Sequence, residues 1–190
     1  MTNDRKLEIL WDERGITKVI LSFGRALDTV DMPLYRKCLT DPVKLNFERL
    51  TGFPEIWASH SKLIPWVLAF FNPLRTHHTY TNLRIEVEGD SAYALVYMTA
   101  RHWKTTDQGS SLNTQYGWYE FGLQRMGENW QINRIKHDFQ WVDGNAGLFD
   151  QTEPQMIAAV QDLFGAENIA RATTGSVGKP SVNRTSGPTH

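Results

Sequence analysis

The chain has 190 residues, of which 41% are apolar and 22% charged, and this balance predicts a globular domain with an apolar core. Its 20 basic and 21 acidic residues leave a formal net charge of −1, so nothing in the composition favours nucleic acid or an anionic membrane as a partner. The single cysteine, Cys38, excludes an internal disulfide and fits a reducing compartment. The N-terminus has no apolar signal segment, and Leu63–Phe71, the most apolar stretch, is too short to span a bilayer. We therefore expect a cytoplasmic protein.

Helical patterns dominate the first part of the chain. One apolar stripe predicts an amphipathic helix from about Asp12 to Leu27, with Asp12 as its N-cap; the stripe consists of Ile16, Val19, Ile20, Phe23 and Leu27. The segment "MPLYRKCL" predicts a short second helix, and "DPVKLNF" predicts a turn followed by a short strand. The segment "PEIWASHSKLIPWVLAFF" is helical in pattern, with Pro65 as a kink or a new start.

Strand patterns follow. Four long strands are predicted over residues 76–87, 91–103, 112–126 and 130–141, joined by the compact turns "EGD" and "GEN" and by the longer polar loop "TTDQGSS". A final helix is predicted at "PQMIAAVQDLF", and the chain from Thr173 onward is too poor in apolar residues to fold. Helices followed by an antiparallel meander predict an α+β fold. A curved sheet closed by helices leaves a cone-shaped interior of the kind that holds small molecules.

Three segments carry a family resemblance: "FGRALDTVDMPLYRKCLTDPVKLNF", "THHTYTNLRIEVEGDSA" and "YGWYEFGLQRMGENWQINRIKHDFQWVDGN". They resemble the SnoaL-like proteins of the nuclear transport factor 2-like superfamily, with parallels in scytalone dehydratase, bile-acid 7α-dehydratase and hexachlorocyclohexane dehydrochlorinase. The resemblance covers roughly residues 10–150 and implies a cone domain over residues 1–150. We expect the final helix within residues 151–172, packed on the domain or on a neighbouring subunit. A flexible tail over residues 173–190 follows. The resemblance also implies a homodimer or homotrimer and a small hydrophobic substrate.

The resemblance also assigns residues. In the dehydratase-like members, an aspartate at the end of the first helix orients a histidine that acts as acid and base, and these roles fall on Asp28 and His78. A second cavity histidine falls on His102. The family's accessory tyrosine and asparagine fall near Phe23 and Tyr119, which do not match them in type, so the dyad is retained and the accessory groups are not. The expected substrate-binding residues are Phe23, Tyr35, Tyr80, His102, Trp118 and Tyr119.

Read without the resemblance, the two adjacent histidines have an open interpretation. Successive strand residues face opposite sides, so His77 and His78 are a poor pair for one metal ion, and no other ligand spacing is recognisable; we expect no metal and no cofactor. Regular alternation groups His77 with the apolar residues Leu83, Ile85 and Val87, and His78 with the polar residues Tyr80, Asn82 and Arg84. Either His78 is therefore a surface residue, or a bulge changes the alternation and turns it inward.

Asp28 also has two interpretations. A carboxylate at the C-terminal end of a helix is disfavoured by the helix dipole, which gives it a reason to pair with an imidazole N–H. It could instead hydrogen-bond the next turn, and Asp31 competes for the same role.

An imidazole oriented by a carboxylate can both take and return a proton near neutral pH. The leading expectation is therefore a cofactor-independent lyase, of the dehydratase type, that carries out a β-elimination on a small hydrophobic, cyclic substrate. An isomerase or polyketide-cyclase-like enzyme with the same dyad is the first alternative. A non-catalytic protein, similar to a dioxygenase β subunit or a ligand-binding module, is the second.

Overall fold

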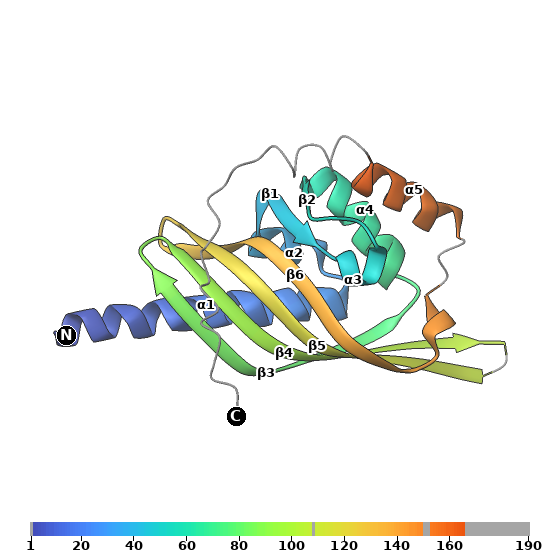
Figure 1. The fold of residues 1–190 in the computed structure, drawn as a ribbon, viewed down its shortest axis with the longest axis horizontal. Helices are drawn as coiled ribbons and strands as arrows, with labels where there is room; N and C mark the ends of the chain where they lie inside the picture. The colour runs from blue at the N-terminus through green and yellow to red at the C-terminus, as the bar shows by residue number, and fades with distance from the viewer. Residues whose placement is uncertain (1, 108, 150–152, 166–190) are drawn as a thin grey trace, which may run out of the picture.

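A curved six-stranded sheet organises the chain, which the computed structural model describes over residues 2–107, 109–149 and 153–165 (Figure 1). The strands lie in the order β2-β1-β6-β5-β4-β3, and every neighbouring pair is antiparallel except β1 with β6. Their bounds are β1 Leu39–Asn46, β2 Ile56–Ala58, β3 Arg75–Glu88, β4 Ser91–Thr106, β5 Gly109–Met126 and β6 Asn129–Gly144. The α+β fold expected from the sequence is confirmed, and the four-stranded meander is β3 to β6.

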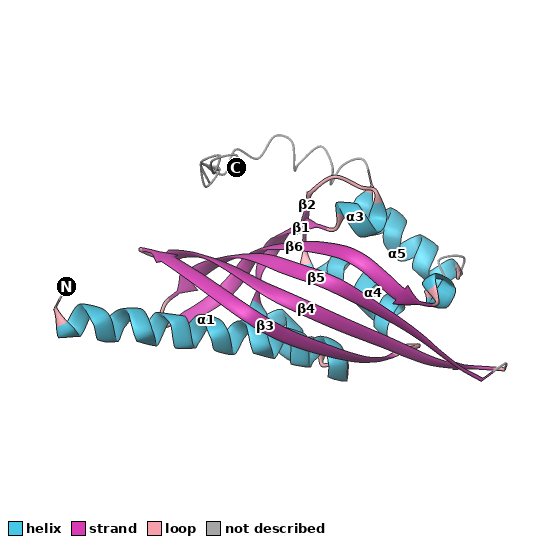
Figure 2. Cartoon of the chain, turned by 60° about the horizontal axis from the view of Figure 1, so that its bottom comes forward, coloured by secondary structure: helices cyan, strands magenta, loops and turns pink. Residues whose placement is uncertain are grey.

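Helices cover the concave side and one end of this sheet. Their bounds are α1 Asn3–Thr29, α2 Met32–Cys38, α3 Glu48–Thr51, α4 His60–Phe71 and α5 Pro154–Phe164, with a short 3-10 turn at Ala146–Leu148. Figure 2 shows α1 extended along the sheet, with α4 and α5 together at one end of it. The core lies between the helices and the sheet, where Ile16, Ile20 and Phe23 of α1 are buried with Phe121 and Ile135 of the sheet. No helix in the described part of the chain is both long and apolar enough to cross a bilayer.

The first helix begins nine residues before the expected start. Thr2 is its N-cap and accepts a hydrogen bond from the Arg5 backbone N–H at 3.3 Å. Asp12 is therefore not a cap: it lies inside the helix and is buried against Arg125. The expected stripe could not reveal the first turns, because Leu7, Leu10 and Trp11 are exposed there.

Two further expectations are corrected. The helix expected from Pro54 begins only at His60, because Ile56–Ala58 pairs with β1 as the edge strand β2. Most of the expected polar loop is strand, since β4 continues to Thr106 and β5 resumes at Gly109. The end of β4 and the start of β5 extend an exposed hairpin, so a buried apolar face could not mark them.

The C-terminal helix α5 packs on α4 of the same chain. The Phe164 ring meets Trp66 edge-on at 5.7 Å and stacks on Phe53 at 5.1 Å. The remainder of the expected C-terminal unit and the expected tail, residues 173–190, lie outside the described residues.

Candidate active site

Asp28 and His78 form a hydrogen-bonded pair inside the fold. The His78 ring Nδ1 lies 2.7 Å from Asp28 Oδ1, and the His78 backbone N–H donates to Oδ2 at 3.0 Å. Thr76 donates a third hydrogen bond, from its hydroxyl to Oδ1 at 3.0 Å. Asp28 is the penultimate residue of α1, and both partners lie on β3, so the pair joins the helix to the sheet. Asp31, the competing carboxylate, instead caps α2 by accepting from the Leu34 N–H.

The pair is shielded from solvent. The His78 side chain is 2% exposed and the Asp28 side chain 19% exposed. Burial by itself would raise the pKa of Asp28, but the hydrogen bonds from His78 and Thr76, together with the nearby His78 charge, lower it. Asp28 is therefore a carboxylate at neutral pH, and an ionised carboxylate accepts hydrogen bonds only. The neutral His78 ring must accordingly carry its proton on Nδ1 and leave Nε2 free as a base.

A bulge in β3 settles which way His78 faces. The pairing of β3 with β4 shifts between Thr81 and Arg84, and Asn82 has φ +51°, in the left-handed region. Two successive residues, Thr81 and Asn82, are both exposed, so the inward set changes phase there. His78 and Leu83 therefore lie on the same face although they are five positions apart, and His77 is exposed on the other face.

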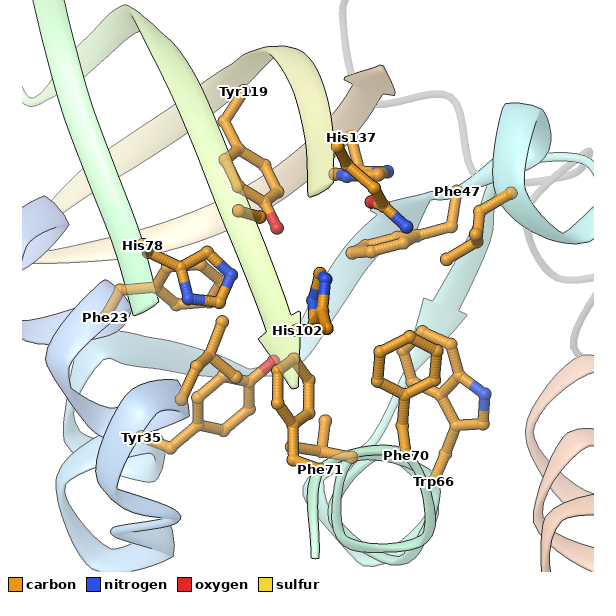
Figure 3. Close-up of a pocket in the computed structure, with 15 residues that line it drawn as sticks. Phe23, Tyr35, Phe47, Trp66, Phe70, Phe71, His78, His102, Tyr119 and His137 are labelled. Carbon is orange, nitrogen blue, oxygen red and sulfur yellow. The ribbon is translucent and has the colours of Figure 1, made fainter. Parts of the chain in front are cut away.

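The His78 ring borders an aromatic cavity inside the cone (Figure 3). The open space is about 30 Å³, enough for no more than about two water molecules. Among the described residues, the walls are Phe23, Leu27, Tyr35, Phe47, Leu50, Trp66, Val67, Phe70, Phe71, His78, Ala100, His102, Gln115, Tyr119 and His137. None of these is Lys, Arg, Asp or Glu, so the interior is apolar with a few neutral polar groups.

The structure brings four expected substrate-binding residues to this cavity, namely Phe23, Tyr35, His102 and Tyr119. Tyr80 lies behind them, 6.1 Å from the His78 ring and 6.0 Å from Tyr119 between ring centroids. Burial raises the pKa of all three tyrosines above the ordinary phenol value, so they remain neutral donors.

Trp118 does not belong to this set. It packs on Tyr97, which is 46% exposed, on the face of β5 opposite to Tyr119. Successive residues of a strand face opposite sides, so Tyr119 and Trp118 could not both line the cavity.

His102 is a neutral histidine next to His78. It is 2% exposed, and its ring centroid lies 6.0 Å from that of His78. Burial, with a smaller contribution from the nearby His78 charge, lowers the pKa of His102 to about 4. His102 therefore cannot supply a proton as an imidazolium at neutral pH, and only hydrogen bonding is open to it.

His137 was missed as a site residue. It is 3% exposed, stacks on Phe47 at 5.3 Å and lies 5.1 Å from Tyr119. Burial, followed by the electrostatic influence of the neighbouring His78 and His102 rings, lowers the pKa of His137 to about 3. The signal was present in the sequence, because Ile135, His137 and Phe139 alternate along one apolar face of a strand.

The histidines in the described part of the chain do not form a metal site. Within residues 2–107, 109–149 and 153–165, no three His, Cys, Asp or Glu side chains gather closely enough to hold a metal ion. His77 points away from the cavity, so the adjacent pair in the sequence is divided between two faces of the sheet.

The comparison with known families is decisive for the fold. Residues 8–136 match the SnoaL-like domain family. The chain belongs to that family. No curated protein matches this SnoaL-like chain in sequence.

Solved structures with the same fold include Kfla4162 from Kribbella flavida, with 23% identity, a TM-score of 0.66 and coverage of 70% of this chain and 93% of that chain. A scytalone dehydratase candidate from Novosphingobium aromaticivorans has 17% identity, a TM-score of 0.59 and coverage of 76% and 92%. The hexachlorocyclohexane dehydrochlorinase LinA-type3 from Novosphingobium barchaimii has 16% identity, a TM-score of 0.60 and coverage of 76% and 97%. At these identities the likeness shows a shared fold, which this SnoaL-like protein has in common with dehydratases and dehydrochlorinases.

Proposed function

We propose that this SnoaL-like protein is a cofactor-independent lyase that catalyses a β-elimination, of the dehydratase type, on a small hydrophobic ring compound. The observation that carries the proposal is the 2.7 Å contact between Asp28 and the ring of His78, which holds the other ring nitrogen as a base at the cavity. The dehydratases and dehydrochlorinases with the same fold support the choice of reaction class.

The reaction needs a single acid–base group. His78 Nε2 takes a proton from a carbon, the electron pair of that C–H bond forms the double bond, and the C–O bond on the adjacent carbon breaks. The imidazolium, stabilised by Asp28, returns the proton to the departing oxygen, so that water leaves. His102 and His137 are too weakly basic to be charged at neutral pH, so both proton transfers fall to His78. A single group on one side of the substrate gives a syn elimination.

Isomerisation with the same dyad is the second candidate. Its support is the geometry of His78, since one base that takes a proton from carbon can return it to another carbon instead of to oxygen. The two reactions differ in whether water is released.

A matched pair of variants tests the proposal, because His77 and His78 are neighbours on opposite faces of β3. The full chain and its variants are incubated with a panel of uncharged cyclic β-hydroxy ketones in D2O, and enone formation and deuterium exchange at the α-carbon are followed. We expect His77→Asn to retain the native rate, while His78→Asn loses about 10²- to 10⁴-fold. Deuterium exchange at the α-carbon without enone formation would contradict the lyase and favour the isomerase. Binding without exchange or elimination would indicate a ligand-binding protein.

A further inference from the structure

Polar side chains cross the interior of the cone from one side to the other. The strands β3, β4 and β6 supply His78, His102 and His137, and β5 supplies Tyr119 and Gln115. Tyr119 and His137 are direct partners across β5 and β6, so His137 lies at the side of the sheet remote from the dyad. Figure 3 shows His102 between His78 and the group formed by His137 and Phe47.

His137 is an unusual choice for a core position. Its Nδ1 is buried and has no hydrogen-bond partner among the described residues, and the same holds for Nδ1 of His102. Burying an unpartnered polar atom costs about 1–3 kcal/mol. A phenylalanine would stack on Phe47 and pack against Tyr119 equally well without that cost. A ring nitrogen placed there has a physical reason if a ligand supplies its hydrogen-bond partner.

The lack of Lys, Arg, Asp and Glu in the described cavity walls restricts the chemical class of that ligand. The Asp28 carboxylate beside His78 is engaged by His78 and Thr76. His102 and His137 are neutral imidazoles, each with one donor and one acceptor nitrogen. A charged substituent would therefore be buried without a counter-charge, whereas a hydroxyl or carbonyl oxygen would be satisfied.

We propose that the cavity takes an uncharged ring compound with a hydroxyl or carbonyl oxygen at the end remote from His78, and that His137 binds this oxygen. The inference rests on the proposed elimination only for placing the reacting carbon at His78. His137 is thus a substrate-binding residue that decides which ring compounds are accepted and how they are oriented.

Three probes of similar size test the inference on the full chain at pH 7: 2-naphthol, naphthalene and 2-naphthoate. Their dissociation constants are measured by NMR titration, with the histidine ring ¹⁵N signals as a local reporter. We expect 2-naphthol to shift the His137 signals and to bind more tightly than naphthalene. We expect 2-naphthoate to bind at least about tenfold more weakly than 2-naphthol, because its carboxylate would be buried unpaired.

His137→Phe should lower the preference for 2-naphthol over naphthalene by about three- to tenfold, the value of one hydrogen bond, without weakening naphthalene. His137→Phe should also unfold at a higher urea concentration than the native protein, because it removes the unpartnered buried nitrogen. If His137 had a purely structural role, the substitution would not increase stability. His137→Gln serves as a second variant, and His77→Asn, on the exposed face, is the control that keeps native binding.

The inference is overturned if 2-naphthoate binds as tightly as 2-naphthol, if none of the probes binds, or if His137→Phe keeps the native preference. His78→Asn separates this result from the proposed reaction. That variant should lose elimination and retain the preference for 2-naphthol. A preference that depends on His137 in a protein that eliminates nothing would sustain the binding site and reject the lyase.

Discussion

His78 holds the Asp28 carboxylate through two groups at once, its ring Nδ1 at 2.7 Å and its backbone N–H at 3.0 Å. The ring and the strand that carries it are thereby fixed to the same carboxylate. The end of α1 and the start of β3 therefore set the direction of the base together, and a change in either contact is expected to disturb the orientation of the ring.

Replacing Asp28 should change the tautomer of His78. In the native protein we expect the neutral ring to carry its proton on Nδ1, because the carboxylate can only accept. In Asp28→Asn the side-chain amide can donate to Nδ1 instead, so the proton moves to Nε2 and the base is lost, with a fall in rate of about 10²- to 10⁴-fold. Long-range ¹H–¹⁵N spectra measure the tautomer directly. Asp31→Asn is the matched control, because Asp31 caps α2 and does not touch His78; an unchanged tautomer in Asp28→Asn would refute the dyad.

The two neutral histidines predict that the protein loses stability in mild acid. Unfolded histidines take up protons near pH 6.5, whereas the folded pKa is about 4 for His102 and about 3 for His137. The unfolded state then binds more protons as the pH falls below about 6.5. The free energy of unfolding should therefore drop by up to about 1.4 kcal/mol per pH unit for each histidine, until the pH reaches the folded pKa. Urea unfolding at pH 7, 6 and 5 measures the slope, which His102→Phe and His137→Phe should each reduce. Equal slopes in the native protein and both variants would contradict the burial of neutral rings.

The bulge in β3 depends on a residue that accepts a left-handed backbone. Asn82 has φ +51°, which asparagine and glycine tolerate and β-branched residues do not. Asn82→Gly should therefore leave the melting temperature close to native, while Asn82→Val should destabilise the fold by about 1–3 kcal/mol. The same pair of substitutions at the exposed neighbour Thr81 serves as the control, with the opposite preference expected. Equal stability of Asn82→Gly and Asn82→Val would show that the bulge is not constrained.

Among the carboxylates in the N-terminal half of α1, Asp12 should cause the largest loss of stability when it is replaced. It accepts two hydrogen bonds from Arg125, at 2.8 and 2.9 Å, and one from Trp130 Nε1 at 3.3 Å. Asp12→Ala leaves these donors without their acceptor and should lower the free energy of unfolding by about 2–4 kcal/mol. Glu8→Ala, which removes only the exposed pair with Arg5, should change it by less than about 1 kcal/mol. Chemical denaturation compares the free energies of unfolding of the two variants. A similar effect of both substitutions would show that the contact between Asp12 and Arg125 stabilises the fold no more than a surface ion pair.

The sequence predicted the architecture because most of its elements bury one face. The stripe from Ile16 to Leu27 and the alternation in the four long strands each report burial, which is the physical cause of the pattern. Elements that lack a buried face were missed or misplaced. These were the first turns of α1 and the exposed ends of β4 and β5. The edge strand β2 was missed although Ile56 and Ala58 are buried, because three residues are too few to show an alternation.

The candidate site was predictable only in part. The resemblance placed Asp28 and His78, and the structure brings them together, but the face of His78 depends on a one-residue bulge that regular alternation cannot reveal. Trp118 was misplaced because aromatic residues suit both faces of a sheet. His137 was not assigned to the site, because the sequence does not show whether a single histidine on a strand has a hydrogen-bond partner.

The cavity of about 30 Å³ has a kinetic consequence. No ring compound fits into a space that holds about two water molecules, so entry requires the wall to open first. One helix, α4, contributes four of the wall side chains, namely Trp66, Val67, Phe70 and Phe71, so its displacement would enlarge the space most directly. Association should then reach a ceiling rate that does not increase with ligand concentration, because the opening of the wall, and not the encounter, limits it.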